Sequence, residues 1–295
     1  MDTFSTYHPS INLFYYIVVI GISMFFMHPV FLGISLVSAA SYAIYLKGKK
    51  AAKPILAGML PMCILTAVLN PIFTHEGVTI LFYLKNGNPL TLESIFYGVG
   101  AGFMLASVVC WFSSFHEIMT SDKFMYLFGK VIPAASLLLA MVLRLVPRFT
   151  AQIKKIRQAQ ECVGRDLKNG NLLDRGHQGF TIFSIAVTWA LENSVETADS
   201  MKSRGYGLRG RTNFFLYRFD RRDKVLMTLL LGEVMAILLM MHTKQVSILY
   251  YPQFTMNGWN AGSIFTYVLF AAFCMTPMIL NIRENIKWHY LRSKI

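Results

Sequence analysis

The chain is poor in charged residues, and among these it is poor in acids. Charged side chains make up 15% of its 295 residues, whereas a typical soluble domain carries about 25%. Hydrophobic residues make up 55%, and the mean hydropathy is +0.47. Lys and Arg number 28 against 15 Asp and Glu, which gives a formal net charge of +13. This composition argues against a soluble enzyme, excludes a disordered chain or a coiled coil, and favours a membrane protein with cationic loops over a nucleic-acid-binding protein.

The sequence also lacks the residue patterns of several catalytic and metal-binding classes. Its four cysteines lie far apart, without the CxxC spacing of a zinc site or the close set of a disulfide framework. It contains no Walker A, HExxH or GxSxG motif, and no two of its seven histidines are four residues apart. The first ten residues hold no Lys or Arg, so we expect no cleavable signal peptide. We therefore predict no catalytic residue, no cofactor-binding residue and no metal ligand in this chain.

Long apolar runs, by contrast, recur along the chain. A helix that crosses a bilayer needs about 20 apolar residues. We predict an all-α integral membrane protein with six spans: Ile11–Met27, Val30–Leu46, Lys53–Phe73 without its first residue, Ile95–Phe115, Val225–Met241 and Ser263–Leu280. His28-Pro29 is expected to join the first two spans as a tight hairpin, and Pro277 interrupts the last apolar run.

The connections between these spans alternate between many and few cations. Residues 119–222 hold 17 Lys and Arg against 8 acids, and further cations lie at 47–53 and after the last span. The connections 74–94 and 242–262 hold one Lys each. Because cytoplasmic loops carry the excess of Lys and Arg, both termini and residues 119–222 are predicted to lie in the cytoplasm, in a multi-pass protein of the plasma membrane.

Three regions follow from this topology. Residues 1–118 are predicted to form an N-terminal membrane region with four spans and an external connection at 74–94. Residues 119–222 are predicted to form a cytoplasmic region, and residues 223–295 a C-terminal membrane region with two spans. In the external connection, apolar runs flank Asn86-Gly87-Asn88-Pro89, a pattern that predicts a β-hairpin.

The cytoplasmic region is too long for a simple connection and has the periodicity of long amphipathic helices. Val131–Val146 is apolar but short for a span and carries Arg144. We expect it either to lie at the inner membrane interface or to penetrate partway, with the Arg144 side chain reaching back to the interface. Pro147 should bend or restart the helix, which then continues to about Gly164. A second helix is expected from about Thr181 to Ser203. Its apolar stripe is Val187, Leu191, Val195, Ala198 and Met201, and its acidic ridge is Glu192, Glu196 and Asp199.

Both of these helices end in a short stretch with Gly and Arg. The stretches are Cys162-Val163-Gly164-Arg165 and Ser203-Arg204-Gly205. One interpretation is a helix C-cap, in which glycine takes the left-handed conformation and a cation meets the helix dipole. The other is a projecting arginine that binds a carboxylate on a partner protein, because a guanidinium can bond a carboxylate through two parallel hydrogen bonds.

Three segments resemble a known family, the CbiQ-like transmembrane T component of energy-coupling factor (ECF) transporters. They are LRLVPRFTAQIKKIRQAQ (Leu143–Gln160), ADSMKSRGYG (Ala198–Gly207) and NPLTLES (Asn88–Ser94). The resemblance implies a non-catalytic subunit of an ABC-type importer. Two cytoplasmic ATPase subunits would bind ATP and dock on the coupling helices, one helix end each. A small membrane subunit would capture a vitamin or metal ion. Membrane lipid is a further expected partner, and nucleic acid is not expected to bind.

The resemblance also implies which residues dock on the ATPases. Ser203, Arg204 and Gly205 match the family's second Ala-Arg-Gly motif, with Ser203 in place of Ala. When the first motif is aligned on Gly164 and Asp166, the family's Ala and Arg fall on Cys162 and Val163. Arg165 lies two positions beyond that arginine position. Either Arg165 replaces the missing contact, or this helix end docks mainly by its shape.

A single acidic residue, Glu233, falls in the middle of a predicted span. A carboxylate within lipid is costly, so it should face protein and have a partner. It could bind a proton or ion, or it could form a structural hydrogen bond to another span. The first possibility supports an alternative function, a stand-alone secondary transporter. Such a transporter would need discontinuous helices in two corresponding halves, and we find no such internal repeat.

Overall fold

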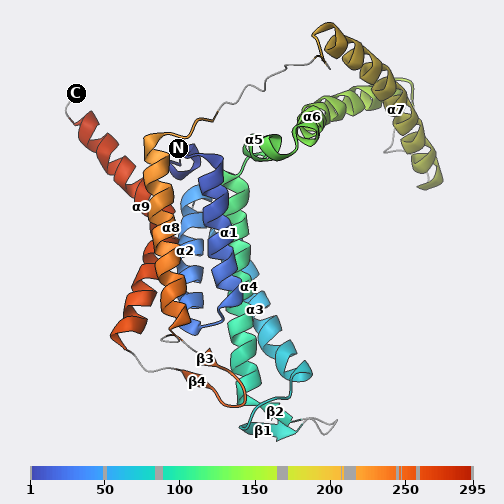
Figure 1. Ribbon diagram of the computed structural model, residues 1–295. Helices are drawn as coiled ribbons and strands as arrows, with labels where there is room; N and C mark the ends of the chain where they lie inside the picture. The colour runs from blue at the N-terminus through green and yellow to red at the C-terminus, as the bar shows by residue number, and fades with distance from the viewer. Residues whose placement is uncertain are drawn as a thin grey trace. The chain divides into compact units, whose positions relative to one another are not determined.

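The computed structural model describes residues 2–48, 52–83, 89–164, 172–206, 208, 217–243, 246, 248–256 and 260–293 (Figure 1). The chain divides into two compact units. Unit 1 comprises Met1–Thr120 and Tyr217–Ile295, and unit 2 comprises Ser121–Leu216. The assignment of these parts to membrane and cytoplasm stays a prediction.

Apolar helices build unit 1 and correspond to the predicted spans. They are α1 (Pro9–Phe25), α2 (Pro29–Lys47), α3 (Ala52–Phe73), α4 (Leu92–Ile118), α8 (Arg221–His242) and α9 (Ala261–Arg292), preceded by the short 3-10 helix η1 (Phe4–Thr6). By length and composition α2, α4, α8 and α9 can cross a membrane, and α1 and the Ala57–Phe73 part of α3 are shorter apolar helices. The prediction of an all-α membrane protein is confirmed.

The core of unit 1 lies where α1, α2, α4, α8 and α9 meet, and it is strongly aromatic. Tyr15 and Trp111 are fully buried, with their rings 5.9 Å apart in a T-shaped arrangement. Polar groups join the helices: the Tyr15 hydroxyl donates to the Cys274 carbonyl at 2.9 Å, and Trp111 Nε1 donates to Ser35 Oγ at 2.9 Å. Water cannot satisfy such groups within lipid, so they hold neighbouring helices in one register.

Helix α9 differs from its predicted extent, because it continues through Pro277 to Arg292. Pro277 has no N–H and removes one helical hydrogen bond. Side chains on the same helix bond nearby carbonyls: Thr276 Oγ1 donates to Ala272 O at 3.0 Å, and Asn281 Nδ2 donates to Pro277 O at 3.0 Å. Proline is tolerated in membrane-spanning helices, so α9 continues past this position.

Short strands lie at the ends of unit 1 helices opposite to the chain termini (Figure 1). Strand β1 (Ile80–Tyr83) pairs antiparallel with β2 (Pro89–Thr91), which confirms the predicted hairpin. The turn residues Asn86, Gly87 and Asn88 lie outside the described residues. A second antiparallel pair joins β3 (Ile248–Leu249) to β4 (Thr255–Met256).

Unit 2 consists, in its described part, of α5 (Ser121–Val131), α6 (Pro133–Cys162) and α7 (Leu172–Ser203). The two long helices, α6 and α7, pack through Ile156, Ile182 and Ala186, with Phe149 beside them. The Phe149 and Trp189 rings lie 5.8 Å apart in a T-shaped contact. Because Phe149 meets Trp189 while Ile156 meets residues earlier in α7, the two helices are antiparallel at their contact.

Both long helices of unit 2 differ from the sequence-based prediction. Helix α6 runs through Pro147 without a break, so the expectation of a restart there is wrong. Residues 143–160 contain long unbranched side chains with good helix propensity, which offsets one missing hydrogen bond. Helix α7 begins at Leu172 rather than near Thr181. Gly176 and Gly179 lower the helix propensity of its first turns, which is why the sequence predicts a later start.

Candidate functional site at the ends of two long helices

The C-terminal end of α7 is a Schellman motif. The Gly205 N–H donates to Lys202 O at 3.0 Å, and the Tyr206 N–H donates to Met201 O at 3.0 Å. Gly205 has φ +81°, in the left-handed region that favours glycine. The prediction of a glycine C-cap is therefore confirmed. Arg204 is the residue directly before this left-handed glycine.

The C-terminal end of α6 has the same geometry over its described residues. Gly164 has φ +82°, and its N–H donates to Glu161 O at 3.1 Å. The helix itself ends at Cys162. Both long helices therefore end in a left-handed glycine, at Gly164 and Gly205.

This shared geometry gives a structural alignment of the two helix ends. Counted from the left-handed glycine, Val163 occupies the position of Arg204, and Cys162 occupies the position of Ser203. Arg165 follows Gly164 as Tyr206 follows Gly205 in the sequence, but Arg165 lies outside the described residues. In this alignment Arg165 is two positions beyond the one that corresponds to Arg204.

The side chains at these helix ends are exposed. Val163 is 71% exposed, and Cys162, Ser203 and Arg204 are also exposed. The Arg204 guanidinium makes no hydrogen bond or ion pair with any residue that the structure describes, whereas Ser203 Oγ donates to Ser200 O at 2.9 Å. A guanidinium without an internal partner retains all five of its N–H donors for another molecule.

The apolar stripe of α7 does not pack in the way that the sequence predicts. Leu191 and Val195 are 65% and 63% exposed, and Val187 is 37% exposed. The face that packs on α6 instead contains Ile182 and Ala186, which lie in the first half of α7. The antiparallel contact with α6 thus leaves the second half of α7 uncovered within unit 2. The acidic ridge of Glu192, Glu196 and Asp199 is exposed there as well.

Glu233 lies in the middle part of α8, and it is half-buried. Its Oε2 atom is buried and accepts no hydrogen bond from the residues that the structure describes. The neighbouring Leu230, Val234 and Ile237 are buried in the core of unit 1. The structure therefore shows no partner for this oxygen within the described part of the chain, and the choice between an ion site and a structural role stays open to experiment.

Comparison with known proteins shows sequence similarity to membrane transport proteins. No protein-family model matches it. It is 28% identical over 100 residues to the energy-coupling factor transporter transmembrane protein EcfT of Lactobacillus helveticus, covering 34% of this chain and 36% of that protein. It is 27% identical over 107 residues to the EcfT protein of Leuconostoc gelidum, covering 36% of this chain and 40% of that protein.

The matched part thus spans about two fifths or less of the length of these curated relatives. Their shared name agrees with the three segments that resemble the T-component family, and the apolar helices of unit 1 suit a transmembrane protein. Over about a third of its length, the chain is similar to the transmembrane protein EcfT of energy-coupling factor transporters.

Proposed function

We propose that the chain is the coupling subunit of an ECF-type ABC importer in the plasma membrane. It transmits the ATP-driven motion of two cytoplasmic ATPase subunits to a small membrane subunit that binds a vitamin or metal ion. The ATPase subunits bind and hydrolyse ATP, and this chain has no catalytic role. The termini and unit 2 face the cytoplasm in this proposal.

The observation that carries the proposal is the repeated geometry at the ends of α6 and α7. Two antiparallel helices end in the same left-handed glycine turn, and each end exposes its side chains. Two similar ends suit two similar partners, one ATPase subunit for each. Arg204 supplies a guanidinium without an internal partner, suited to a carboxylate on an ATPase.

Replacement of Arg204 tests this docking role. If its guanidinium pairs with a buried carboxylate on an ATPase, Arg204→Ala leaves that carboxylate unpaired and weakens the interface by about 2–5 kcal/mol. Arg204→Glu adds repulsion and should be worse. The measurements are ATPase recovery with the purified chain and substrate uptake in cells. Lys202→Glu is the matched control, because Lys202 is exposed in the last turn of the same helix.

Arg165 distinguishes the two interpretations of the first helix end. If Arg165 replaces the contact absent at Val163, Arg165→Ala should lower ATPase recovery and add to the effect of Arg204→Ala. If this end docks by shape, Arg165→Ala should have little effect, whereas Val163→Glu should lower recovery. Full ATPase recovery and normal uptake with Arg204→Glu would contradict the docking role of Arg204.

The second candidate function, a stand-alone secondary transporter, rests on the buried Oε2 of Glu233. A carrier of this kind would purify without ATPase subunits and would transport substrate when reconstituted alone. An ECF subunit should bring ATPases with it from mild detergent. Identification of the co-purifying proteins therefore separates the two functions directly.

A further inference from the structure

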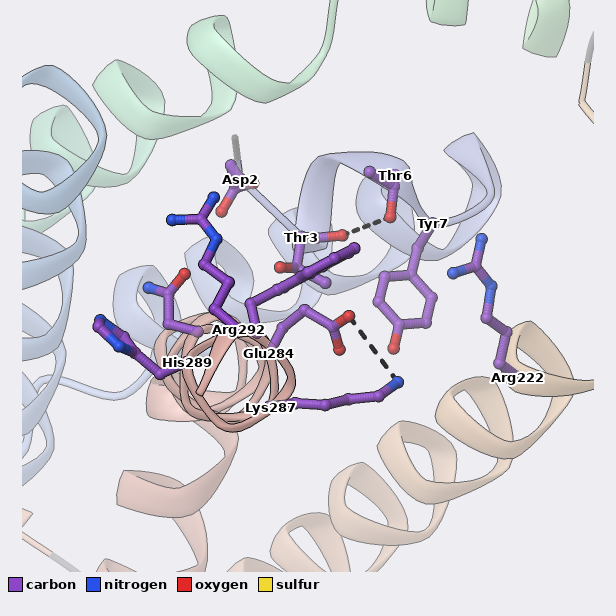
Figure 2. A pocket seen from close by; sticks show the side chains of 11 residues that line it. Asp2, Thr3, Thr6, Tyr7, Arg222, Glu284, Lys287, His289 and Arg292 are labelled. Carbon is purple, nitrogen blue, oxygen red and sulfur yellow. Dashed lines mark hydrogen bonds and ion pairs between the residues drawn. The ribbon is translucent and has the colours of Figure 1, made fainter. Parts of the chain in front are cut away.

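Unit 1 contains a pocket of about 860 Å³ that the coupling function does not use (Figure 2). Three separate parts of the unit line it: residues 2–7, Arg222 at the start of α8, and the last turns of α9. Its volume lies within the range of small-molecule binding sites.

The pocket lining has more free positive charge than negative charge. Its permanent cations are Arg222, Lys287 and Arg292, and its acids are Asp2 and Glu284. The Asp2 carboxylate is already engaged, because it accepts hydrogen bonds from the Ser5 N–H at 2.8 Å, from the Tyr42 hydroxyl at 3.3 Å and from Asn281 Nδ2. Glu284 lies 4.0 Å from Lys287, so the two opposite charges offset each other.

Two guanidinium groups from different helices remain for a ligand. Arg292 makes no hydrogen bond or ion pair with the described residues, and Figure 2 shows it on the opposite side of Tyr7 from Arg222. The Arg222 guanidinium lies over the Tyr7 ring, 5.6 Å from its centroid. Stacking on a ring leaves the N–H groups in the guanidinium plane available to an anion.

Tyr7 adds a hydrogen-bond donor to the same pocket. Burial raises the pKa of its hydroxyl, an effect that the nearby Arg222 partly offsets. The hydroxyl therefore stays protonated at neutral pH and can donate. The two guanidinium groups supply donors only and the phenol can donate as well, which suits the two non-bridging oxygens of a phosphodiester.

The same turns of α9 carry the side chains of a membrane interface. Trp288, Tyr290 and Ile286 are 57%, 59% and 64% exposed, and Trp288 lines the pocket. Trp and Tyr concentrate where a bilayer meets water, and basic pockets between membrane helices bind anionic headgroups there. We propose that this pocket binds the phosphate-containing headgroup of an anionic phospholipid, to which Arg222 and Arg292 supply positive charge from two sides of the pocket.

Native mass spectrometry of the full-length, delipidated chain in detergent tests this site. The chain is titrated with phosphatidylglycerol, with phosphatidylcholine and with inorganic phosphate. We expect saturable binding of one phosphatidylglycerol and at least tenfold weaker binding of phosphatidylcholine. One cation near a membrane surface contributes about fivefold in affinity, so Arg222→Gln with Arg292→Gln should weaken phosphatidylglycerol binding about 25-fold.

The matched control is Arg221→Gln with Lys224→Gln, which removes two exposed cations from the start of α8 that do not line the pocket. It should change the affinity less than twofold, and an equal loss in both double variants would overturn the site. Inorganic phosphate that binds more tightly than the lipid would overturn the lipid as ligand. If the Gln pair does not fold, Arg222→Lys with Arg292→Lys replaces it. That pair keeps the charge but loses the paired bonds, and wild-type affinity in it would contradict the proposal.

Discussion

Gly164 and Gly205 adopt backbone conformations that other residues adopt only at a cost. At φ near +80°, a side chain costs about 1–2 kcal/mol because its Cβ approaches the following carbonyl. Since both glycines close the last turn of a long helix, they also set the direction in which Val163 and Arg204 leave that helix. The proposed site therefore depends on the two glycines as well as on Arg204.

Gly205→Ala should destabilise the last turn of α7 by about 1–2 kcal/mol. Faster hydrogen exchange of the Gly205 and Tyr206 amides, which donate to Lys202 and Met201, would report this opening. Gly176→Ala is the control, because Gly176 lies inside α7 with open space around its Cβ position. It should stabilise the helix by about 0.5–1 kcal/mol, so equal effects of both substitutions would contradict the C-cap argument.

The role of the Glu233 carboxylate gives the second prediction at the scale of single residues. A structural role predicts that Glu233→Gln keeps normal assembly and transport, because glutamine has the same shape and can still accept a hydrogen bond. Glu233→Leu should then raise the melting temperature in detergent, since it removes a buried oxygen without a described partner. Loss of uptake in Glu233→Gln, with normal ATPase recovery, would support the ion-site interpretation instead.

At the scale of elements, α3 and α4 approach closely because α4 presents glycines to α3. A Cβ at Gly102 would lie 2.8 Å from Cys63 Cα and 2.6 Å from Thr66 Oγ1. A Cβ at Gly98 would lie 2.8 Å from Thr66 O. Small residues four positions apart allow two membrane helices to bring their backbones together. The contact thus depends on the absence of side chains at two positions.

Gly102→Ala should therefore push α3 away from α4 and destabilise unit 1 by about 1–3 kcal/mol. The measurement is the thermal unfolding of the purified chain in detergent. Gly58→Ala on α3 is the control, because nothing lies within 4 Å of its Cβ position. A melting temperature of Gly102→Ala equal to that of wild type would show that α3 can shift without cost.

For the whole molecule, the orientation in the membrane is the prediction on which the coupling function depends. Cysteines introduced at Asn86 and Asn257, which lie outside the described residues, should react with an impermeant thiol reagent added to intact cells. Cysteines at Gly48 and at Gly170, the second of which is also outside the described residues, should not react. The native Cys162 is exposed and belongs to unit 2, so it should react only after the membrane is opened.

Reaction of Cys162 or of a cysteine at Gly170 in intact cells would place unit 2 outside. The ATPase-coupling function would then be untenable, because ATPase subunits act in the cytoplasm. The lipid-binding pocket is tested separately, since its measurement needs neither an orientation nor an ATPase. Failure of one proposal therefore leaves the other standing on its own experiment.

Local features of this protein were determined by the sequence alone. Hydropathy indicated the apolar helices, since each needs only its own run of residues, and the pattern around residues 86–89 indicated the hairpin. The glycine ends at Gly164 and Gly205 followed from a preference of single residues. The Ser203-Arg204-Gly205 motif could likewise be recognised from the sequence, because its residues are consecutive. The helix does not restart at Pro147, because one missing hydrogen bond costs less than the rest of the helix contributes.

Only the tertiary structure decided which faces of these helices pack and which remain open. The sequence showed an apolar stripe on α7, but the contact with α6 buried Ile182 and Ala186 and left Leu191 and Val195 exposed. The phosphate-binding pocket likewise brings Tyr7, Arg222 and Arg292 together from three distant parts of the chain. Such juxtapositions depend on how all helices pack at once, whereas span, turn and cap depend on the energies of neighbouring residues.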